Sequence, residues 1–213
     1  MSESFIAVAS ALDMVREDQK AFALNDIKNQ IRASVAVKVA LLDDEKLLGQ
    51  VRQLAQTCLS ALRTGGKVIF AGNGGSFADA QHLSAEFTSR FLFDRASLAS
   101  LTLGTNNSAI SAIGNDYGYE QVFARELSGI AKPEDVFIPI STSGNSPNIL
   151  AAVAVAKELD VTTMAWTGET GGQLKSMCDC ICIPSHETAH IQECHIMVGH
   201  ILCGLVERDY FGK

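Results

Sequence analysis

The stretch KVIFAGNGGSFADAQHLSAEF (residues 67–87) predicts how this chain folds. Its first six residues, KVIFAG, form a short apolar run that is typical of a buried strand, and the glycines behind it end that strand. Apolar residues then recur at helical spacing from about residue 77 to residue 90. The stretch therefore predicts a strand, a glycine-rich turn and a helix, which is how a β–α–β unit begins.

The same alternation continues to the end of the chain. Four more apolar runs predict strands at 98–104, 135–141, 161–168 and 180–185, with helical spacing between them. We expect a three-layer αβα fold with a five-stranded parallel sheet, and right-handed crossovers favour the flavodoxin-like strand order 2-1-3-4-5. The last helix, from about residue 188 to 210, is apolar on nearly every side and should be buried.

Residues 1–63 contain no proline and show helical spacing throughout, so they predict a helical N-terminal extension. We assign residues 1–40 to an arm that serves oligomerisation and 41–213 to the α/β domain. Packing of the arm on a partner subunit and packing back on its own domain remain equally open.

Composition limits the possible partners and compartments. A formal net charge of −7 and the lack of a clustered basic patch argue against nucleic acid as a partner. The N-terminus lacks the basic region of a secretory signal, and no apolar run is long enough to cross a membrane. The motif CDCIC (178–182), which holds three of the six cysteines, does not have zinc-site spacing, so we expect small core thiols in a reducing cytoplasm.

Two polar turns follow the first and third predicted strands, at GNGGS (72–76) and STSGNS (141–146). In the expected strand order these strands flank the switch point, where open α/β sheets bind ligands. The hydroxyls of STSGNS precede a helix N-terminus and suit a phosphate group, although an ordinary capped turn has the same composition. GNGGS is not a G-x-G-x-x-G motif, so a nicotinamide cofactor is not expected, and its glycines allow a ligand to approach the backbone.

Polar residues at helical spacing form a second candidate group. His82 and Glu86 are four residues apart and share one side of a helix, where they suit metal binding or acid–base chemistry. A surface pair would look the same. Gln192 and His200 flank one face of the last helix and need either core partners or a ligand. Residue patterns alone do not name a reaction.

Four motifs, AGNGGSFADAQHLSAEFTSRF, SAIGNDYGYEQVF, ISTSGNSPNIL and TAHIQECHIMVGHIL, occur in the order found in phosphoheptose isomerases. From about residue 40 to 208 the chain resembles this family of the sugar isomerase (SIS) superfamily. The resemblance implies a role for each matching residue. Glu86 would be the general base and His200 the general acid, and His82, Glu86, Gln192 and His200 would bind one Zn²⁺ per subunit. The substrate would contact Asn73, Gly74, Gly75, Glu86, Asn115, Asp116, Ser141, Thr142, Ser143, Ser146 and Gln192.

The resemblance further implies an activity and an assembly. The family converts sedoheptulose 7-phosphate to D-glycero-D-manno-heptose 7-phosphate through an enediol, the first step of nucleotide-activated heptose biosynthesis in bacteria. It forms homotetramers whose active sites lie between subunits. Two alternatives stay open: isomerisation of another phosphosugar, and a non-catalytic SIS adaptor that binds the replication initiator protein. Adaptors lack the full acid–base set, which this chain retains.

Overall fold

A computed structural model describes residues 23–212, and residues 1–22 of the predicted arm lie outside the described part. Five parallel strands form one sheet in the order β2-β1-β3-β4-β5, which confirms the predicted topology. The strands are β1 (Val68–Gly72), β2 (Ser100–Thr102), β3 (Val136–Ile140), β4 (Thr162–Thr167) and β5 (Asp179–Cys182).

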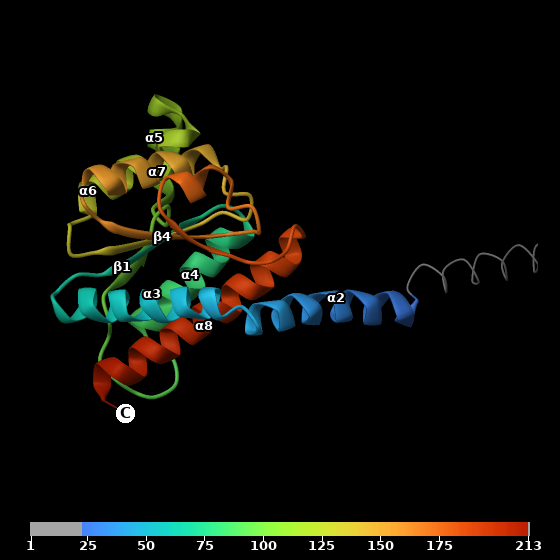
Figure 1. The fold of residues 1–213 in the computed structure, drawn as a ribbon. Helices are drawn as coiled ribbons and strands as arrows, with labels where there is room; N and C mark the ends of the chain where they lie inside the picture. The colour runs from blue at the N-terminus through green and yellow to red at the C-terminus, as the bar shows by residue number, and fades with distance from the viewer. Residues whose placement is uncertain (1–22, 213) are drawn as a thin grey trace, which may run out of the picture.

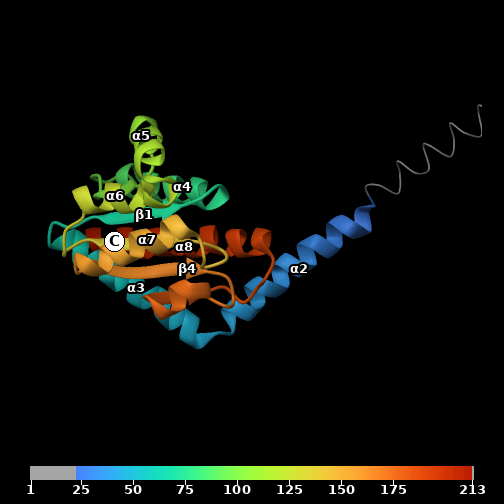
Figure 2. The same cartoon turned by 90° about the horizontal axis from the view of Figure 1, so that it is seen from above.

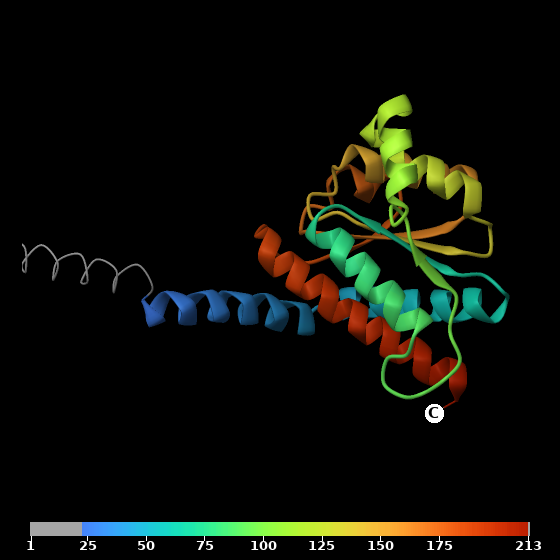
Figure 3. The ribbon, with the colours of Figure 1, turned by 180° about the vertical axis from the view of Figure 1, so that it is seen from behind.

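Helices cover both faces of the sheet, as expected for a three-layer fold (Figure 1). One face carries α3 (Glu45–Arg63), α4 (Gly75–Thr88) and α8 (Thr188–Phe211), and Figure 3 shows α4 and α8 side by side. The other carries α6 (Val122–Ile130) and α7 (Pro147–Glu158), and α5 (Asn107–Tyr117) projects beyond them. Two short 3₁₀ helices, η1 (Tyr119–Gln121) and η2 (Gly172–Ser176), complete the described elements.

The strands divide their side chains between two apolar cores because successive residues of a strand point to opposite faces. In β1, Val68 and Phe70 pack into the core under α3, α4 and α8, whereas Ile69 and Ala71 pack under α6 and α7. Every residue of β1 and of β3 is buried. The central strands therefore provide a rigid base for the turns at their carboxyl ends.

The N-terminal helical region departs from the prediction of unbroken helix. The helix α2 (Leu24–Leu42) ends at Asp43, and α3 begins after Asp44, whose carboxylate accepts a hydrogen bond from the backbone N–H of Leu47. Aspartate is a preferred N-cap, so this residue type starts a new helix where apolar spacing alone predicts continuation. Figures 1 and 2 show α2 extending away from the domain.

The last helix also differs from the expectation. One side of α8 is buried, but Glu193 is exposed and Ile201 retains 45% of its accessible surface. The prediction that the whole helix is buried is therefore wrong in this chain.

The cysteines behave as predicted from their spacing. All six are free thiols, and those of the CDCIC motif share one side of the sheet, since Cys180 is buried in the α6–α7 core and Cys178 and Cys182 pack against it. Among residues 23–212, no helix is long and apolar enough to span a bilayer.

Candidate active site

The two polar turns lie side by side, as the strand order requires. Gly72 at the end of β1 pairs with Ile140 at the end of β3. Beyond them, the side-chain amides of Asn73 and Asn148 exchange two hydrogen bonds, each of 2.9 Å. Asn148 is buried in the first turn of α7, so it fixes the orientation of the Asn73 amide. The sequence analysis did not identify Asn148, although its place beside STSGNS made it a candidate.

The glycine turn is tight because backbone fills the space around it. A Cβ on Gly72 would lie 2.4 Å from the carbonyl oxygen of Ser76, and Gly74 has φ +56°, which side-chain-bearing residues rarely adopt. Gly74 and Gly75 are exposed, so the backbone leading into α4 is open to a ligand. The phenol of Tyr119 adds a hydrogen bond of 3.3 Å to the Asn73 side-chain oxygen.

The second turn has the compact form expected of a phosphate cradle. The hydroxyls of Ser141 and Ser146 lie 3.0 Å apart, and Ser146 precedes Pro147 at the start of α7. Thr142 is half-buried and Ser143 is exposed. Hydroxyl groups therefore surround a helix N-terminus, where the helix dipole favours an anion.

The proposed acid–base residues converge from two helices. His82 Nε2 lies 3.2 Å from Glu86 Oε1 along α4 and 2.9 Å from His200 Nε2 on α8. One ligand atom from each residue lies within 4.8 Å of the others. A single chain thus brings together His82, Glu86 and His200, although Glu86 and His200 are 114 positions apart in the sequence.

Gln192 lies at the glycine turn, about two turns before His200 on α8. Its side-chain nitrogen lies 3.5 Å from the Ser76 hydroxyl, and a Cβ on Gly75 would meet that nitrogen at 2.7 Å. Gln192 therefore faces the backbone of the glycine turn, where a ligand could displace it.

A second carboxyl group, that of Asp79, lies one turn before His82. One of its oxygens is buried and has no hydrogen-bond partner among the described residues. Burial raises the pKa of Asp79, and the nearby His82 opposes that effect. Asp79 is not among the side chains whose ligand atoms converge, so Glu86 supplies the carboxylate of the cluster.

Asn115 and Asp116 are not brought to these residues within one chain. They lie in the last turn of helix α5, and the Asn115 amide donates to the Asp116 carboxylate. Both are exposed and line an open depression on α5 with Asn107 and Ser108. Among residues 23–212, no hydrogen bond joins either of them to the polar turns.

The remaining histidines have other surroundings. His195 is fully buried, and its Nε2 lies 3.1 Å from the carbonyl oxygen of Thr167, so the core accommodates it without a ligand. His186 lies in the loop before α8 and pairs with Glu169 at the surface, and His190 is half-buried.

Comparisons with known proteins identify the family of this chain. The SIS domain family matches residues 35–168. A phosphoheptose isomerase of Burkholderia pseudomallei (strain K96243) is 49% identical over 191 residues, which cover 89% of this chain and 97% of the relative. A phosphoheptose isomerase of Aneurinibacillus thermoaerophilus is 50% identical over 190 residues, covering 88% of this chain and 96% of the relative.

Solved structures show the same similarity in three dimensions. A phosphoheptose isomerase from Francisella tularensis superimposes with a TM-score of 0.83 at 32% identity, covering 88% of this chain and 99% of that one. The phosphoheptose isomerase of Neisseria gonorrhoeae gives a TM-score of 0.80 at 37% identity, covering 86% and 97%. Shared sequence along nearly the whole length, the same sheet and the motifs in one order place this chain in the phosphoheptose isomerase family of SIS-domain proteins.

Proposed function

We propose that this protein is an aldose–ketose isomerase that converts sedoheptulose 7-phosphate to D-glycero-D-manno-heptose 7-phosphate. The observation that carries the proposal is the convergence of Glu86 with His82 and His200 in a member of this family. Moving a carbonyl from carbon 2 to carbon 1 needs a base beside the carbon-bound proton and an acid beside the oxygens. The two helices supply both groups.

The STSGNS turn would bind the phosphate of the sugar. Its hydroxyls at Ser141, Thr142, Ser143 and Ser146 and the N-terminus of α7 suit a dianion in an otherwise acidic protein. The glycine turn next to it would contact the sugar through Asn73, Gly74 and Gly75. Gln192, which faces this turn, would form a hydrogen bond with a hydroxyl group of the sugar.

In the proton transfer, the Glu86 carboxylate would take the proton from carbon 1 of the ketose and return it to carbon 2 of the enediol. His200 would move the proton between the two oxygens, as an imidazole can in either direction near neutral pH. Each positioned proton transfer typically contributes about 10²–10⁴-fold to the rate.

The donor set fits zinc. Two imidazole nitrogens and a carboxylate oxygen are ordinary zinc ligands, and catalytic zinc can expand its coordination to take up a substrate oxygen. We propose that His82, Glu86 and His200 hold one Zn²⁺ that organises the site, with Gln192 as the fourth group that the family resemblance suggests. Glu86 and His200 would exchange between binding the ion and their roles in proton transfer. When bound, the ion would polarise the carbonyl and stabilise the negative charge of the enediolate.

We also propose that the chain works as a homotetramer in the cytoplasm, where its free thiols stay reduced. Large apolar side chains recur every three or four residues along α2 and are 50–72% exposed: Leu24, Ile27, Ile31, Val35, Val39 and Leu42. A stripe of this size is costly in water and is typical of a subunit interface. Assembly would bring Asn115 and Asp116, which project on α5, to the site of a neighbouring subunit.

Proton NMR of sedoheptulose 7-phosphate with the purified protein in deuterated water tests the activity, with and without added zinc. An aldose anomeric signal is expected, with deuterium at carbon 2 to the extent that the proton held by Glu86 exchanges with solvent before it is returned. If no aldose forms either with or without added zinc, the isomerase activity is excluded. The adaptor alternative would then be tested by measuring binding to the replication initiator protein.

A further inference from the structure

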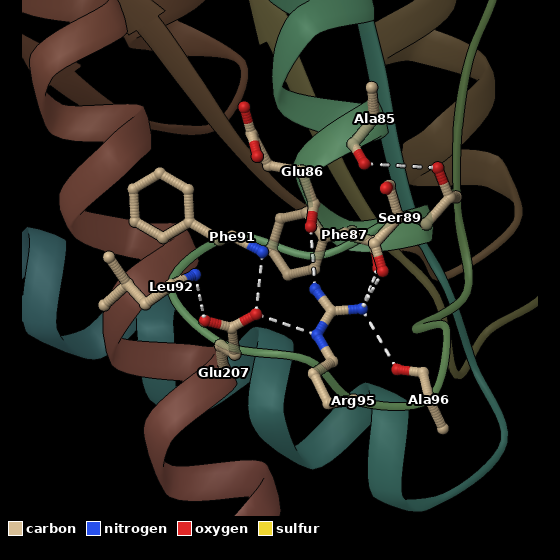
Figure 4. Close-up of polar contacts among 10 residues, drawn as sticks. Ala85, Glu86, Phe87, Ser89, Phe91, Leu92, Arg95, Ala96 and Glu207 are labelled. Carbon is tan, nitrogen blue, oxygen red and sulfur yellow. Dashed lines mark hydrogen bonds and ion pairs between the residues drawn. The ribbon is translucent and has the colours of Figure 1, made fainter.

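A buried ion pair lies directly behind the acid–base cluster. Arg95, in the loop between α4 and β2, donates from Nε to Glu207 Oε1 on α8 at 2.8 Å (Figure 4). The two side chains are only 3% and 1% exposed. Burying two charges is costly, and an ion pair of this kind is weak evidence for stability alone. Its contacts therefore need another explanation.

The guanidinium of Arg95 donates hydrogen bonds to several backbone carbonyl groups at and after the end of α4. Its remaining N–H groups donate to the carbonyl oxygens of Glu86 at 2.7 Å and Phe87 at 2.6 Å, and to those of Ser89 and Ala96, each at 3.0 Å. The last carbonyls of a helix have no partner within the helix and favour a positive charge. The last turn of α4 has no basic residue of its own, so Arg95 supplies that charge from the following loop.

Glu207 holds the other half of the loop. Its two carboxylate oxygens accept the backbone N–H groups of Phe91 at 2.8 Å and Leu92 at 2.7 Å (Figure 4). Burial by itself would raise the pKa of Glu207, but these amides and Arg95 outweigh it and lower the pKa. The carboxylate is therefore ionised and fixes both main-chain positions.

Phe91 connects the loop bound by Glu207 to the acid–base cluster. Its ring stacks on the ring of His200, with centroids 5.5 Å apart and an interplanar angle of 18°. His200 and Glu207 are seven residues apart on α8 and so lie on the same side, two turns from one another. The loop thus contacts the backbone of the proposed base at one end and the ring of the proposed acid at the other.

We infer that the Arg95–Glu207 ion pair positions the catalytic groups: Arg95 holds the backbone of Glu86, and Glu207 holds Phe91 against His200. Neither residue touches substrate. The inference rests on the proposed isomerase function, because it assigns what sets the geometry of that site. A displacement of about 1 Å in a catalytic group can lower a rate by about 100-fold, so contacts that fix Glu86 and His200 in position can have a large effect on turnover.

The substitution Arg95→Lys tests the inference while keeping a positive charge beside Glu207. Lysine cannot span the same carbonyls because it lacks the planar fork of arginine. We expect kcat to fall by roughly 10- to 100-fold, with KM within about twofold of its original value, since the phosphate and sugar contacts lie elsewhere. If the Arg95→Lys protein folds and its kcat is unchanged, the ion pair only stabilises the fold and the inference is overturned.

Phe91→Leu provides a second test that leaves the buried charges and the Phe91 amide in place, and it decides the matter if Arg95→Lys does not fold. We expect a lower kcat that Phe91→Tyr restores, because tyrosine keeps the ring. Leu92→Ala is the matched control: its amide also binds Glu207, but its side chain is 66% exposed. Equal kcat in Phe91→Leu and Leu92→Ala would contradict the role of Phe91.

A readout independent of turnover separates this inference from the proposed function. In protein labelled with ¹³C-histidine, the His200 ring signal, assigned with His200→Asn, should move in Arg95→Lys and Phe91→Leu but stay in place in Leu92→Ala. If the wild-type protein does not isomerise sedoheptulose 7-phosphate, the proposed function fails, and this signal still decides the positioning role. An unmoved signal in both variants would overturn it.

Discussion

His200 Nε2 lies 2.9 Å from His82 Nε2, although the two residues come from different helices and are 118 residues apart. At this distance the two nitrogens cannot both carry a proton. Either one accepts a hydrogen bond from the other, or both bind a cation. With Glu86 3.2 Å from His82, the arrangement suits a shared ion or proton.

Replacing Glu86 by Gln should abolish isomerisation, since an amide cannot accept the carbon-bound proton. We expect a loss of about 10²–10⁴-fold or more in kcat, with the melting temperature nearly unchanged because the side chain is partly exposed. The NMR assay and a thermal melt measure the two effects. Glu193→Gln, on the exposed side of α8, is the control, and full activity in Glu86→Gln would exclude the base role.

Zinc should bind at about one ion per chain through the converging side chains. His82→Asn and His200→Asn each remove one imidazole of a site that needs several ligands, so the metal content should fall well below that of the original protein. Elemental analysis after dialysis against zinc gives the stoichiometry. His186→Asn removes an exposed imidazole outside the cluster and should bind as much zinc as before; equal content in all variants would point to adventitious metal.

A charge in the apolar stripe of α2 should dissociate the assembly. Ile31→Asp together with Val35→Asp would bury carboxylates in the proposed interface, which is strongly unfavourable for unpaired charges. Light scattering coupled to size-exclusion chromatography should then show a smaller species, whereas Asn29→Asp, on another side of α2, should not change the mass. An unchanged tetramer in the double variant would place the interface elsewhere.

Stability should fall in acid because of His195. Burial lowers the pKa of His195 from its usual 6.5 to about 4, while the backbone oxygen of Thr167 acts in the opposite direction. Between these values the unfolded chain binds more protons than the folded one, so the free energy of unfolding rises with pH across this window. The free energy of unfolding should therefore fall by about 3 kcal/mol in total as the pH drops from 6.5 towards 4, and it should be unaffected by His195 above pH 6.5. Urea titrations at several pH values should show this slope, which should flatten in His195→Asn; an unchanged slope in that variant would assign the acid sensitivity to other groups.

Cys182 should react faster than the buried thiol of Cys58. Its pKa is lowered to about 6, first by the hydrogen bond with Cys180 and then by the Thr167 hydroxyl, whose oxygen lies 3.3 Å from the sulfur, and by Lys175 and Lys46. Because thiolate is the nucleophile, alkylation by iodoacetamide should rise through pH 6 and label Cys182 before the buried Cys58, whose pKa burial raises to about 12. Peptide mass spectrometry measures the order, and simultaneous labelling of both would contradict it.

Local pattern was enough to predict most of the fold. Apolar runs located every strand, and the parallel order followed from the handedness of the crossovers. The break at Asp43–Asp44 was missed because helical spacing continues across it, and only the capping contact to Leu47 shows where α3 starts. The exposed side of α8 was missed for a related reason, since apolar content does not say which side a neighbour covers.

The candidate site divides in the same way. Sequence by itself determined the residue types and their local placement: His82 and Glu86 on one side of a helix, and hydroxyls around a helix start. Tertiary structure decided that His200 joins the first pair, that Asn115 and Asp116 stand apart on α5, and that Arg95 and Glu207 meet behind the cluster. Backbone periodicity is local and can be read from neighbouring residues, whereas the meeting of side chains more than 100 residues apart depends on how α4 and α8 pack on the sheet.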